Sequence, residues 1–483
     1  MENIIIAIND IIWSDFLIIL CIGIGIYFST VTRFLQISYL KEMIRLLFDG
    51  SASDRGVTSF QAFTMAIAGR VGTGNIAGVA TAIAMGGPGA VFWMWLIAFL
   101  GSASAFVEAT LGQIYKQVDN GEYRGGPAYY IEKGLGVKWY ALVFAGATIL
   151  STAFFLPGVQ SNSIASSINN AFNIPVEYTG ITVTSLLGLV IFGGVKRIGK
   201  VAGIVVPFMA AAYVLMAVII MALHVTEIPA VFGLIIRSAF GFEPAFSGIL
   251  GMAISWGVKR GIYSNEAGQG TAPHAASAAE VSHPAKQGLV QAFSVYIDTL
   301  FVCTATAFMI IFTGQYNVLN DKGGFVVENL PGVPIGPEFT QFAISAHFPA
   351  IGSAFVAIAL LFFAFTTIMA YYYIAETNLS YLNRNGVQKW KLWVLRSLIL
   401  VATFYGSIKT AEMAWTLGDI GVGMMAWLNL IAIFLLRKPA LLALKDYQQQ
   451  RKAGLDPCFD PKKLGIKNAN FWEVKANEKV KVH

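Results

Sequence analysis

Two segments of the sequence place glycines together with charged and amide side chains inside stretches that are otherwise apolar. One reads AGRVGTGNIAG (68–78) and the other reads SWGVKRGIYSNEAGQG (255–270). Glycine is a poor helix former, and a charged side chain inside a membrane is costly to bury. An irregular backbone is tolerated in a membrane only where it faces protein or a water-filled cavity. The two segments therefore predict interrupted helices whose free backbone groups can bind a ligand.

A broken helix offers binding groups of both signs. A half-helix that starts near Asn75 would present free N–H groups and the positive end of its dipole, which suit a carboxylate. The preceding half-helix would end in free carbonyl oxygens, which suit Na⁺. Together they predict a zwitterionic substrate beside a cation. Close helix packing through small residues is the alternative, and it explains Gly74 and Gly78 alone.

The rest of the chain supplies membrane helices to hold these segments. It is 56% hydrophobic and only 12% charged, whereas soluble proteins carry about 25% charged residues. The apolar residues fall in blocks of about 20, the length of a helix that crosses roughly 30 Å of hydrocarbon. We expect an all-α polytopic membrane protein with eleven spans, at 13–32, 58–84, 90–115, 139–168, 178–193, 200–223, 246–270, 288–313, 350–375, 392–408 and 412–436.

The interrupted spans are the second and the seventh, five spans apart. Transporters built from inverted five-helix repeats place broken helices at such corresponding positions. We expect one transmembrane transporter domain over 1–436, followed by a basic cytoplasmic tail over 437–483. The domain would consist of an extra helix (13–32), repeat one (58–223) and repeat two (246–436).

The positions of Lys and Arg indicate the orientation in the membrane. Most of those between the spans lie on alternate connections, and the opposite connections hold only Arg237, Lys322 and Lys409. By the positive-inside rule the C-terminus is cytoplasmic and the N-terminus lies outside the plasma membrane. We interpret the tail as a solvated, inside-anchoring segment, with partner binding as the alternative. The net charge of +6 is therefore no sign of nucleic-acid binding.

The residue pattern offers nothing typical of an enzyme. Cys21, Cys303 and Cys458 show no paired spacing, so neither a disulfide framework nor a metal-ligand cluster is supported. The sequence has no nucleophile elbow or phosphate-binding loop, and the glycines at 72–74 lack the strand–helix context of a dinucleotide site. We expect no catalytic residues and no organic cofactor.

Two motifs resemble the signatures of a known family. The run GGPGAVFWMWLIAFLG (86–101) and the run SNEAGQGTAP (264–273) resemble those of the alanine/glycine:cation symporters, also called sodium:alanine symporters. The likeness covers nearly the whole chain in length and motif order. It implies the wider leucine-transporter (amino acid–polyamine–cation) fold. It also implies uptake of a small neutral amino acid (alanine, glycine, possibly serine or glutamine) coupled to Na⁺ or H⁺.

The resemblance assigns ligands at the first interruption. In the leucine-transporter fold the substrate carboxylate meets the unwound helix, which implies the residues Gly72, Thr73, Gly74 and Asn75. The shared sodium site of that fold implies carbonyls of Ala68 and Val71 with hydroxyls of Thr366 and Thr367. Oxygen ligands suit a hard cation. The alternative is that the two threonines bond back to carbonyls of their own helix.

Further substrate contacts are expected from two other spans. Gln160 can both donate and accept a hydrogen bond, so it can bind a substrate ammonium or carboxylate; its alternative role is to join helices. The second interrupted helix contributes Trp256, Gly257 and Tyr263 as walls of a side-chain pocket. Aromatic residues in membrane helices also serve as packing or interface anchors.

Charged and amide residues near the interruptions are expected to support or gate the site. The resemblance implies that Glu108 braces the second broken helix, where Asn265 and Glu266 also lie. Arg70 either occupies the space of an additional Na⁺ beside the substrate carboxylate or pairs with Glu266 or Glu108. Asp298 is a further acid within a span, and pairing with Lys259 or Arg260 could explain it or Glu108 without a role in coupling.

The coupling ion is expected to be Na⁺. The five histidines, His224, His274, His283, His347 and His483, lie near span ends or in loops, whereas a proton relay would need one at mid-span. An H⁺-coupled transporter of the same fold is the first alternative. An ion channel is the second, although two broken helices at repeat positions argue against it. We expect a monomer in the lipid bilayer, without nucleic-acid partners.

Overall fold

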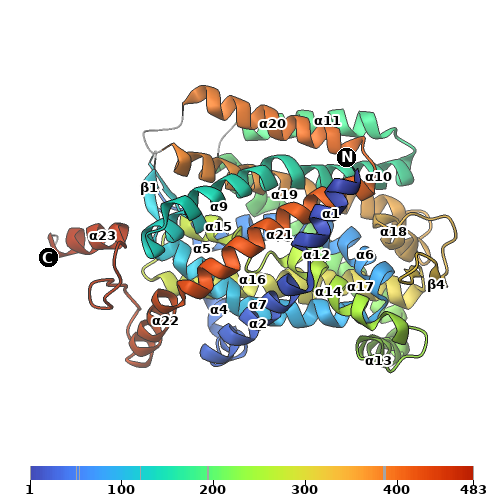
Figure 1. Cartoon of the computed structure of the whole chain (residues 1–483), viewed down its shortest axis with the longest axis horizontal. Coiled ribbons are helices and arrows are strands. Elements are labelled where there is room, and N and C mark those ends of the chain that lie inside the picture. The colour runs from blue at the N-terminus through green and yellow to red at the C-terminus, as the bar shows by residue number, and fades with distance from the viewer. Residues whose placement is uncertain are drawn as a thin grey trace.

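The computed structural model describes residues 2–50, 52–53, 55–119, 121–192, 195–383 and 388–481. Helices dominate it, packed side by side in one bundle (Figure 1). The helices of the first half are α1 (Glu2–Ile12), α2 (Asp15–Val31), α3 (Leu35–Ser38), α4 (Leu40–Leu47), α5 (Ser59–Arg70), α6 (Val79–Gly86), α7 (Gly89–Ile114), α8 (Pro127–Tyr130), α9 (Lys138–Leu150), α10 (Leu156–Phe172), α11 (Val176–Ile191) and α12 (Val195–Leu223).

The second half of the chain adds helices of similar length and two small hairpins. Its helices are α13 (Ile228–Ala239), α14 (Leu250–Asn265), α15 (Ala272–Ala278), α16 (Pro284–Val295), α17 (Thr304–Thr313), α18 (Pro337–Ser345), α19 (Gly352–Leu382), α20 (Lys389–Ser407), α21 (Ala411–Leu435), α22 (Arg437–Lys452) and α23 (Asn470–Lys481). The antiparallel strand pairs are β1 (Gln117–Asp119) with β2 (Glu122–Arg124), and β3 (Asn317–Leu319) with β4 (Phe325–Glu328).

The helices agree with a membrane protein. In the part of the chain that the structure describes, seven helical stretches are long and apolar enough to cross a membrane: Asn3–Val31, Gly89–Ile114, Lys138–Phe172, Val201–Leu223, Pro284–Thr313, Gly352–Leu382 and Ala411–Leu435. The count of eleven spans and the inverted repeat stay predictions. The predicted span 178–193 corresponds to α11, and its last residue, like Arg384 among the cations that indicated orientation, lies outside the described residues.

Several long helices contain a π-helical turn, where the helix is locally wider. These turns cover Gly74–Gly78, Ile131–Leu135, Ser151–Phe155 and Tyr296–Cys303. The turn Ser151–Phe155 joins α9 to α10, and the turn Tyr296–Cys303 joins α16 to α17. Such turns occur often at functional sites. Gly74–Gly78 and Tyr296–Cys303 lie against each other beside the first helix interruption.

Both predicted helix interruptions are present. Helix α5 ends at Arg70, Val71 is extended (φ −76°, ψ 91°), and helical backbone resumes at Gly74. Helix α14 ends where Glu266 adopts the left-handed conformation (φ 54°), and α15 begins only at Ala272. Gly270, between them, has φ +89°, and a Cβ on it would lie 2.7 Å from Pro127 Cγ. The backbone at this interruption therefore requires glycine.

The C-terminal residues are packed against the bundle, so the interpretation of the tail as a solvated segment is wrong. Phe459 and Trp472 are only 3% and 2% exposed. The Trp472 indole donates to the carbonyl of Gln113 (2.8 Å), and the Phe459 N–H donates to the carbonyl of Ser282 (3.0 Å). These aromatic residues bury apolar surface, which outweighs the solvation of the lysines around them. We call the end of the bundle that carries α22 and α23 the tail end.

The tail end also joins the two interrupted helices. Val57, just before α5, pairs in parallel with Ala279, just after α15. The Val57 N–H donates to the carbonyl of Ala278 (3.0 Å), and the Glu280 N–H donates to the carbonyl of Val57 (2.9 Å). Lys475 of α23 forms an ion pair with Glu280. The opposite end carries the hairpin β3–β4, and we call it the hairpin end (Figure 1).

Candidate substrate and cation site

The first interruption is held open by two amide side chains. The Gly72 N–H donates to Asn75 Oδ1 (2.8 Å), and the Thr73 N–H donates to Gln160 Oε1 of α10 (3.0 Å). These bonds replace the intrahelical bonds that the break removes. A neutral amide can exchange its partner for a charged ligand at small cost, so the arrangement keeps the backbone available for a carboxylate.

Oxygen atoms from α5 and α19 converge on the tail-end side of this interruption. Thr367 Oγ1 lies 2.9 Å from the carbonyl oxygen of Ala68 and 3.4 Å from that of Val71. It lies 3.0 Å from the Phe363 carbonyl of its own helix. A hydroxyl and free carbonyls are the ligands that Na⁺ prefers. The Thr367 hydroxyl and the Ala68 and Val71 carbonyls fit the donor set that the resemblance implied.

Thr366 differs from its neighbour. Its hydroxyl donates to the carbonyls of Phe362 and Phe363, each at 3.0 Å, and to no atom of α5 among the described residues. This is the bonding within one helix that was the alternative for both threonines. The structure thus brings Thr367, but not Thr366, to the ends of the broken helix.

The space around Gly72 and Gly74 is tight. A Cβ on Gly72 would overlap Thr367 Oγ1 and lie 2.9 Å from Gln160 Oε1. A Cβ on Gly74 would lie 3.0 Å from the Cα of Ser264. The two interrupted helices therefore meet at Gly74, whereas Gly72 allows α19 and α10 to approach the interruption.

Two buried polar atoms at this meeting point have no hydrogen-bond partner among the described residues. They are Thr73 Oγ1 and the Tyr263 hydroxyl. An unpaired buried hydroxyl costs about 1–3 kcal/mol, so both hydroxyls would gain from a polar partner. Tyr263 packs its ring against Trp415, with centroids 4.9 Å apart. Thr73, Tyr263 and Gln160 are thus placed together around the first interruption.

Asp298 joins the two interruptions through a network that the sequence did not reveal. Its carboxylate accepts from Asn75 Nδ2 (2.6 Å), from Ser264 Oγ (2.9 Å) and from Thr299 Oγ1 (2.7 Å). Thr306 Oγ1 also donates to the Asn75 carbonyl (2.6 Å). Pairing with Lys259 or Arg260, the alternative that would have explained Asp298 or Glu108 without a role in coupling, is not observed among the described residues.

Lys259 and Arg260 instead bind Asp419 of α21. Lys259 Nζ lies 2.8 Å from Asp419 Oδ2, and the Arg260 guanidinium makes a two-pronged pair with the same carboxylate (2.7 and 3.0 Å). Both cations lie on α14 before its break and line a cavity at the hairpin end together with Asp419 of α21. Trp256 and Trp415 also line this cavity.

Trp256 and Gly257 are consequently not placed at the interruption. The Trp256 ring lies under Lys259 Nζ (4.9 Å) and near the Arg260 guanidinium (5.1 Å), in the cavity at the hairpin end. A Cβ on Gly257 would collide with Ala90 and Trp93 of α7. Gly257 therefore permits close contact between α14 and α7, which is the packing role of a small residue.

The second interruption is held by carboxylates. Glu108 Oε2 of α7 accepts from the Gly270 N–H (3.1 Å) and from Asn429 Nδ2 (2.7 Å), which is the bracing contact that the resemblance implied. Glu266 Oε2 accepts from Thr271 Oγ1 (2.7 Å). Asn265 Oδ1 accepts from the Ala267 N–H (3.0 Å). The amide of Asn429 also donates to the Gly268 carbonyl (2.9 Å).

Arg70 is buried and forms no ion pair with an acid of the described chain. Its Nη1 donates to the carbonyl of Gln291 (3.2 Å) and to Ser294 Oγ, both on α16. Nε and Nη2 have no partner among the described residues. A direct pair with Glu266 or Glu108, one of the two expectations for Arg70, is therefore not formed.

Comparisons with known proteins agree with these features. The family model described as the sodium:alanine symporter family matches residues 1–461. A candidate sodium/proton-dependent alanine carrier of Bacillus subtilis (strain 168), YrbD, is 64% identical over 98% of both chains. The sodium/proton-dependent alanine carrier protein of Bacillus sp. (strain PS3) is 57% identical over 89% of this chain and 97% of its own.

A more distant relative and a solved structure extend the comparison. The sodium/alanine symporter AgcS of Methanococcus maripaludis is 37% identical over 92% of this chain and 97% of its own. A solved transporter of the nucleobase-cation-symport-1 family covers 84% of this chain and 82% of its own, with 16% identity and a TM-score of 0.33. The chain therefore belongs to the sodium:alanine symporter family, whose members are membrane transporters and not enzymes.

Proposed function

We propose that the protein is a secondary active symporter that takes up a small neutral amino acid, with alanine as the main substrate, together with Na⁺. Glycine is a second substrate in this proposal, and serine and glutamine are to be tested beside them. The observation that carries the Na⁺ coupling is the convergence of Thr367 Oγ1 with the carbonyls of Ala68 and Val71. The names of the relatives, alanine carriers and symporters, support the substrate.

The substrate would bind where the two interrupted helices meet. Its carboxylate would replace the amide oxygens of Asn75 and Gln160 on the N–H groups of Gly72 and Thr73. The Thr73 and Tyr263 hydroxyls, which are buried without partners among the described residues, would provide further polar contacts. The tight packing around Gly72 and Gly74 favours a small side chain on the substrate.

Alternating access would follow from the position of this site between two closed ends. The Arg260–Asp419 pair lines the cavity at the hairpin end, and in our proposal it closes the path from that cavity to the site. The Val57–Ala279 pairing would close the tail end. In our proposal the hairpin end faces outward and the tail end faces the cytoplasm, with the N-terminus outside the plasma membrane.

The proposed transporter functions as a monomer in the lipid bilayer.

A matched pair of variants tests the Na⁺ site. Thr367→Ala removes the hydroxyl that meets α5, whereas Thr366→Ala removes one that bonds only within α19. Loss of one oxygen ligand is worth about 1.5–3 kcal/mol, which corresponds to about a tenfold or larger rise in the Na⁺ concentration for half-maximal alanine uptake. Uptake into proteoliposomes measures this value for both variants.

The two variants must differ for the assignment to stand. We expect Thr366→Ala to keep the Na⁺ dependence of the parent protein. An unchanged Na⁺ dependence in Thr367→Ala would show that the cation binds elsewhere. If an H⁺ gradient alone drives uptake and Na⁺ has no effect, the protein is the H⁺-coupled alternative, which the names of two relatives also permit.

A further inference from the structure

The core between the two interruptions contains more acidic than basic groups. Glu108, Glu266 and Asp298 are all buried, and the cation among them is Arg70. Among the described residues, no ion pair joins any of these three carboxylates to a Lys, Arg or His. If all were ionised, the group would carry an excess negative charge in the centre of a membrane. Such a charge is strongly unfavourable without a bound cation or proton.

The three carboxylates differ in the number of hydrogen bonds that they accept. The Asp298 carboxylate accepts from three side chains, and Glu108 accepts from Gly270 and Asn429. Glu266 accepts from Thr271 alone, and its Oε1 has no partner in the part of the chain that the structure describes. Donated hydrogen bonds stabilise the charged form of a carboxylate. Glu108 Oε1 is likewise without a partner among the described residues, but Glu266 receives the fewest hydrogen bonds of the three acids, which favours it as the group that takes up a proton.

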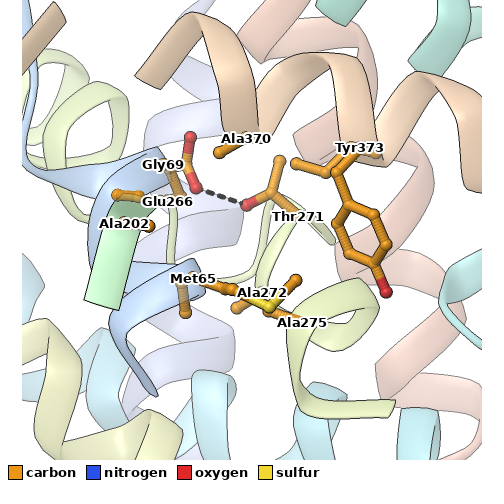
Figure 2. Close-up of a pocket in the computed structure, with 12 residues that line it drawn as sticks. Met65, Gly69, Ala202, Glu266, Thr271, Ala272, Ala275, Ala370 and Tyr373 are labelled. Carbon is orange, nitrogen blue, oxygen red and sulfur yellow. Dashed lines mark hydrogen bonds between the residues drawn. The ribbon is translucent and has the colours of Figure 1, made fainter. Parts of the chain in front are cut away.

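Glu266 also lines a small cavity. Thr271 and Tyr373 line it as well, and its other walls are mostly apolar, among them Met65, Ala68, Ala202 and Ala370. Figure 2 shows the Glu266 carboxylate beside Thr271 among these small side chains. The cavity is large enough for a water molecule. It lies on the tail-end side of both interruptions, because Met65 precedes the break in α5 and α15 follows the break after α14.

The carboxylate contacts both interrupted helices. Glu266 itself ends α14 in the left-handed conformation, which is uncommon for a residue other than glycine. A Cβ on Gly69, the last residue but one of α5, would lie 3.3 Å from Glu266 Oε2. A change of charge on this carboxylate therefore acts on the backbone of α5 and α14 together.

Other titratable groups surround Glu266 but are less suited to carry the proton. They are Arg70 on α5, Glu108 on α7, Tyr263 on α14, His274 on α15, Asp298 after α16, and Tyr371 and Tyr373 on α19. His274 donates from Nδ1 to the Thr271 carbonyl (3.0 Å) and accepts at Nε2 from Asn378 (2.9 Å), which describes a neutral ring with both nitrogens occupied. Phenols stay protonated across the physiological pH range.

We propose that Glu266 binds and releases one proton in each transport cycle, at a site separate from the cation site at Thr367. A proton that arrives from the hairpin end binds Glu266 Oε1 to form the neutral acid, and its release to water in the cavity on the tail-end side restores the carboxylate. This inference rests on the proposed symport function, because it assigns a second coupled cation to the same transporter.

Proton movement with alanine tests the proposal directly. The full-length protein is reconstituted into vesicles that contain a pH-sensitive dye, with equal Na⁺ on both sides and the membrane potential clamped. Addition of external alanine should acidify the interior. In Glu266→Gln, which fixes the neutral form, the number of protons moved per alanine should fall at least fivefold. Glu266→Asp, which keeps the titratable group, should restore most of it.

A second variant keeps the test decisive if Glu266→Gln does not fold. Thr271→Val removes the only described donor to Glu266, so the proton should bind more tightly. The pH of half-maximal uptake should then rise by about one unit, as expected for a lost hydrogen bond to a charged group. An unchanged pH profile in Thr271→Val, or undiminished proton movement in Glu266→Gln, would overturn the proposal.

The outcomes also separate this inference from the proposed function. If Na⁺ drives alanine uptake but the parent protein moves no protons with alanine, Glu266 has no coupling role and the symport proposal stands. If neither a Na⁺ nor an H⁺ gradient drives alanine uptake, the proposed function itself is wrong.

Discussion

The two helix interruptions differ in the groups that hold them. At the first, neutral amides of Asn75 and Gln160 accept from the free N–H groups. At the second, the carboxylate of Glu108 accepts from the Gly270 N–H, and the carboxylate of Glu266 accepts from the Thr271 hydroxyl. A neutral amide yields to a charged ligand more readily than a carboxylate does. This difference supports the two proposals above, that the ligand binds at the first interruption and that a charge-dependent change occurs at the second.

The largest effect on uptake is expected at the first interruption. In Gly72→Ala the added methyl group would overlap Thr367 Oγ1 and crowd Gln160. Overpacking of this kind costs about 1–3 kcal/mol, which corresponds to a loss of about tenfold or more in uptake. Gly251→Ala is a matched control, because its Cβ would meet no atom within 4 Å. Equal uptake by the two variants in proteoliposomes would mean that the first interruption tolerates a side chain and binds no ligand closely.

A smaller effect is expected at the second interruption. Glu108→Ala leaves the Gly270 N–H and the Asn429 amide without their acceptor. The loss of a hydrogen bond to a charged group costs about 1.5–3 kcal/mol, so we expect a lower melting temperature in detergent and reduced uptake. Glu108→Gln, which retains an oxygen acceptor, should recover part of both. If Glu108→Gln and Glu108→Ala were equally impaired, the charge of Glu108 and not its hydrogen bonds would be the important property.

The smallest effect on uptake is expected for Glu280→Gln, at the tail end, where Glu280 follows the pairing of the two interrupted helices and binds Lys475 of the tail. Burial alone would raise the pKa of Glu280, but hydrogen bonds from Lys475, Tyr123 and Ser53 outweigh it and lower the pKa to about 2. The lowered pKa means that this carboxylate stabilises the fold above about pH 4.5. The stabilisation is lost as the pH falls toward 2.

Proteolysis of the tail measures this contribution. In Glu280→Gln we expect the C-terminal residues to be cleaved about two- to fivefold faster at neutral pH, because a partly exposed ion pair is worth at most about 1 kcal/mol. Uptake should change little. Cleavage at the parent rate would show that the aromatic residues hold the tail without help from Glu280.

The positions of the two interruptions could be predicted from the sequence because they depend on local composition. Glycines, an Arg and an Asn close together in an apolar span favour a break in the helix, and α5 and α14 end where these residues predicted. The contact of Thr367 with α5 follows from the family resemblance. The separate behaviour of Thr366 follows only from the rotation of α19, which the sequence does not reveal.

The pairing of charges could not be predicted. Asp298 was recognisable as an acid within a span, but its partners come from α14 and from the first interruption, far away in sequence. Asp419 gave no sign that two cations of α14 would bind it. The tail was misinterpreted because its lysines are conspicuous in the sequence, whereas the burial of Phe459 and Trp472 depends on surfaces that other segments provide.

The packing of the tail sets an order of events during synthesis. Trp472 binds Gln113, and Lys475 binds Glu280, so these contacts can form only after the residues up to Lys475 have left the ribosome. Until then the segment around Val57 and Ala279 lacks the cover that α22 and α23 provide. The newly made protein therefore has an uncovered tail end until α22 and α23 have been translated. Premature termination before Trp472 would yield an inserted bundle that degradation enzymes can recognise by its exposed apolar surface.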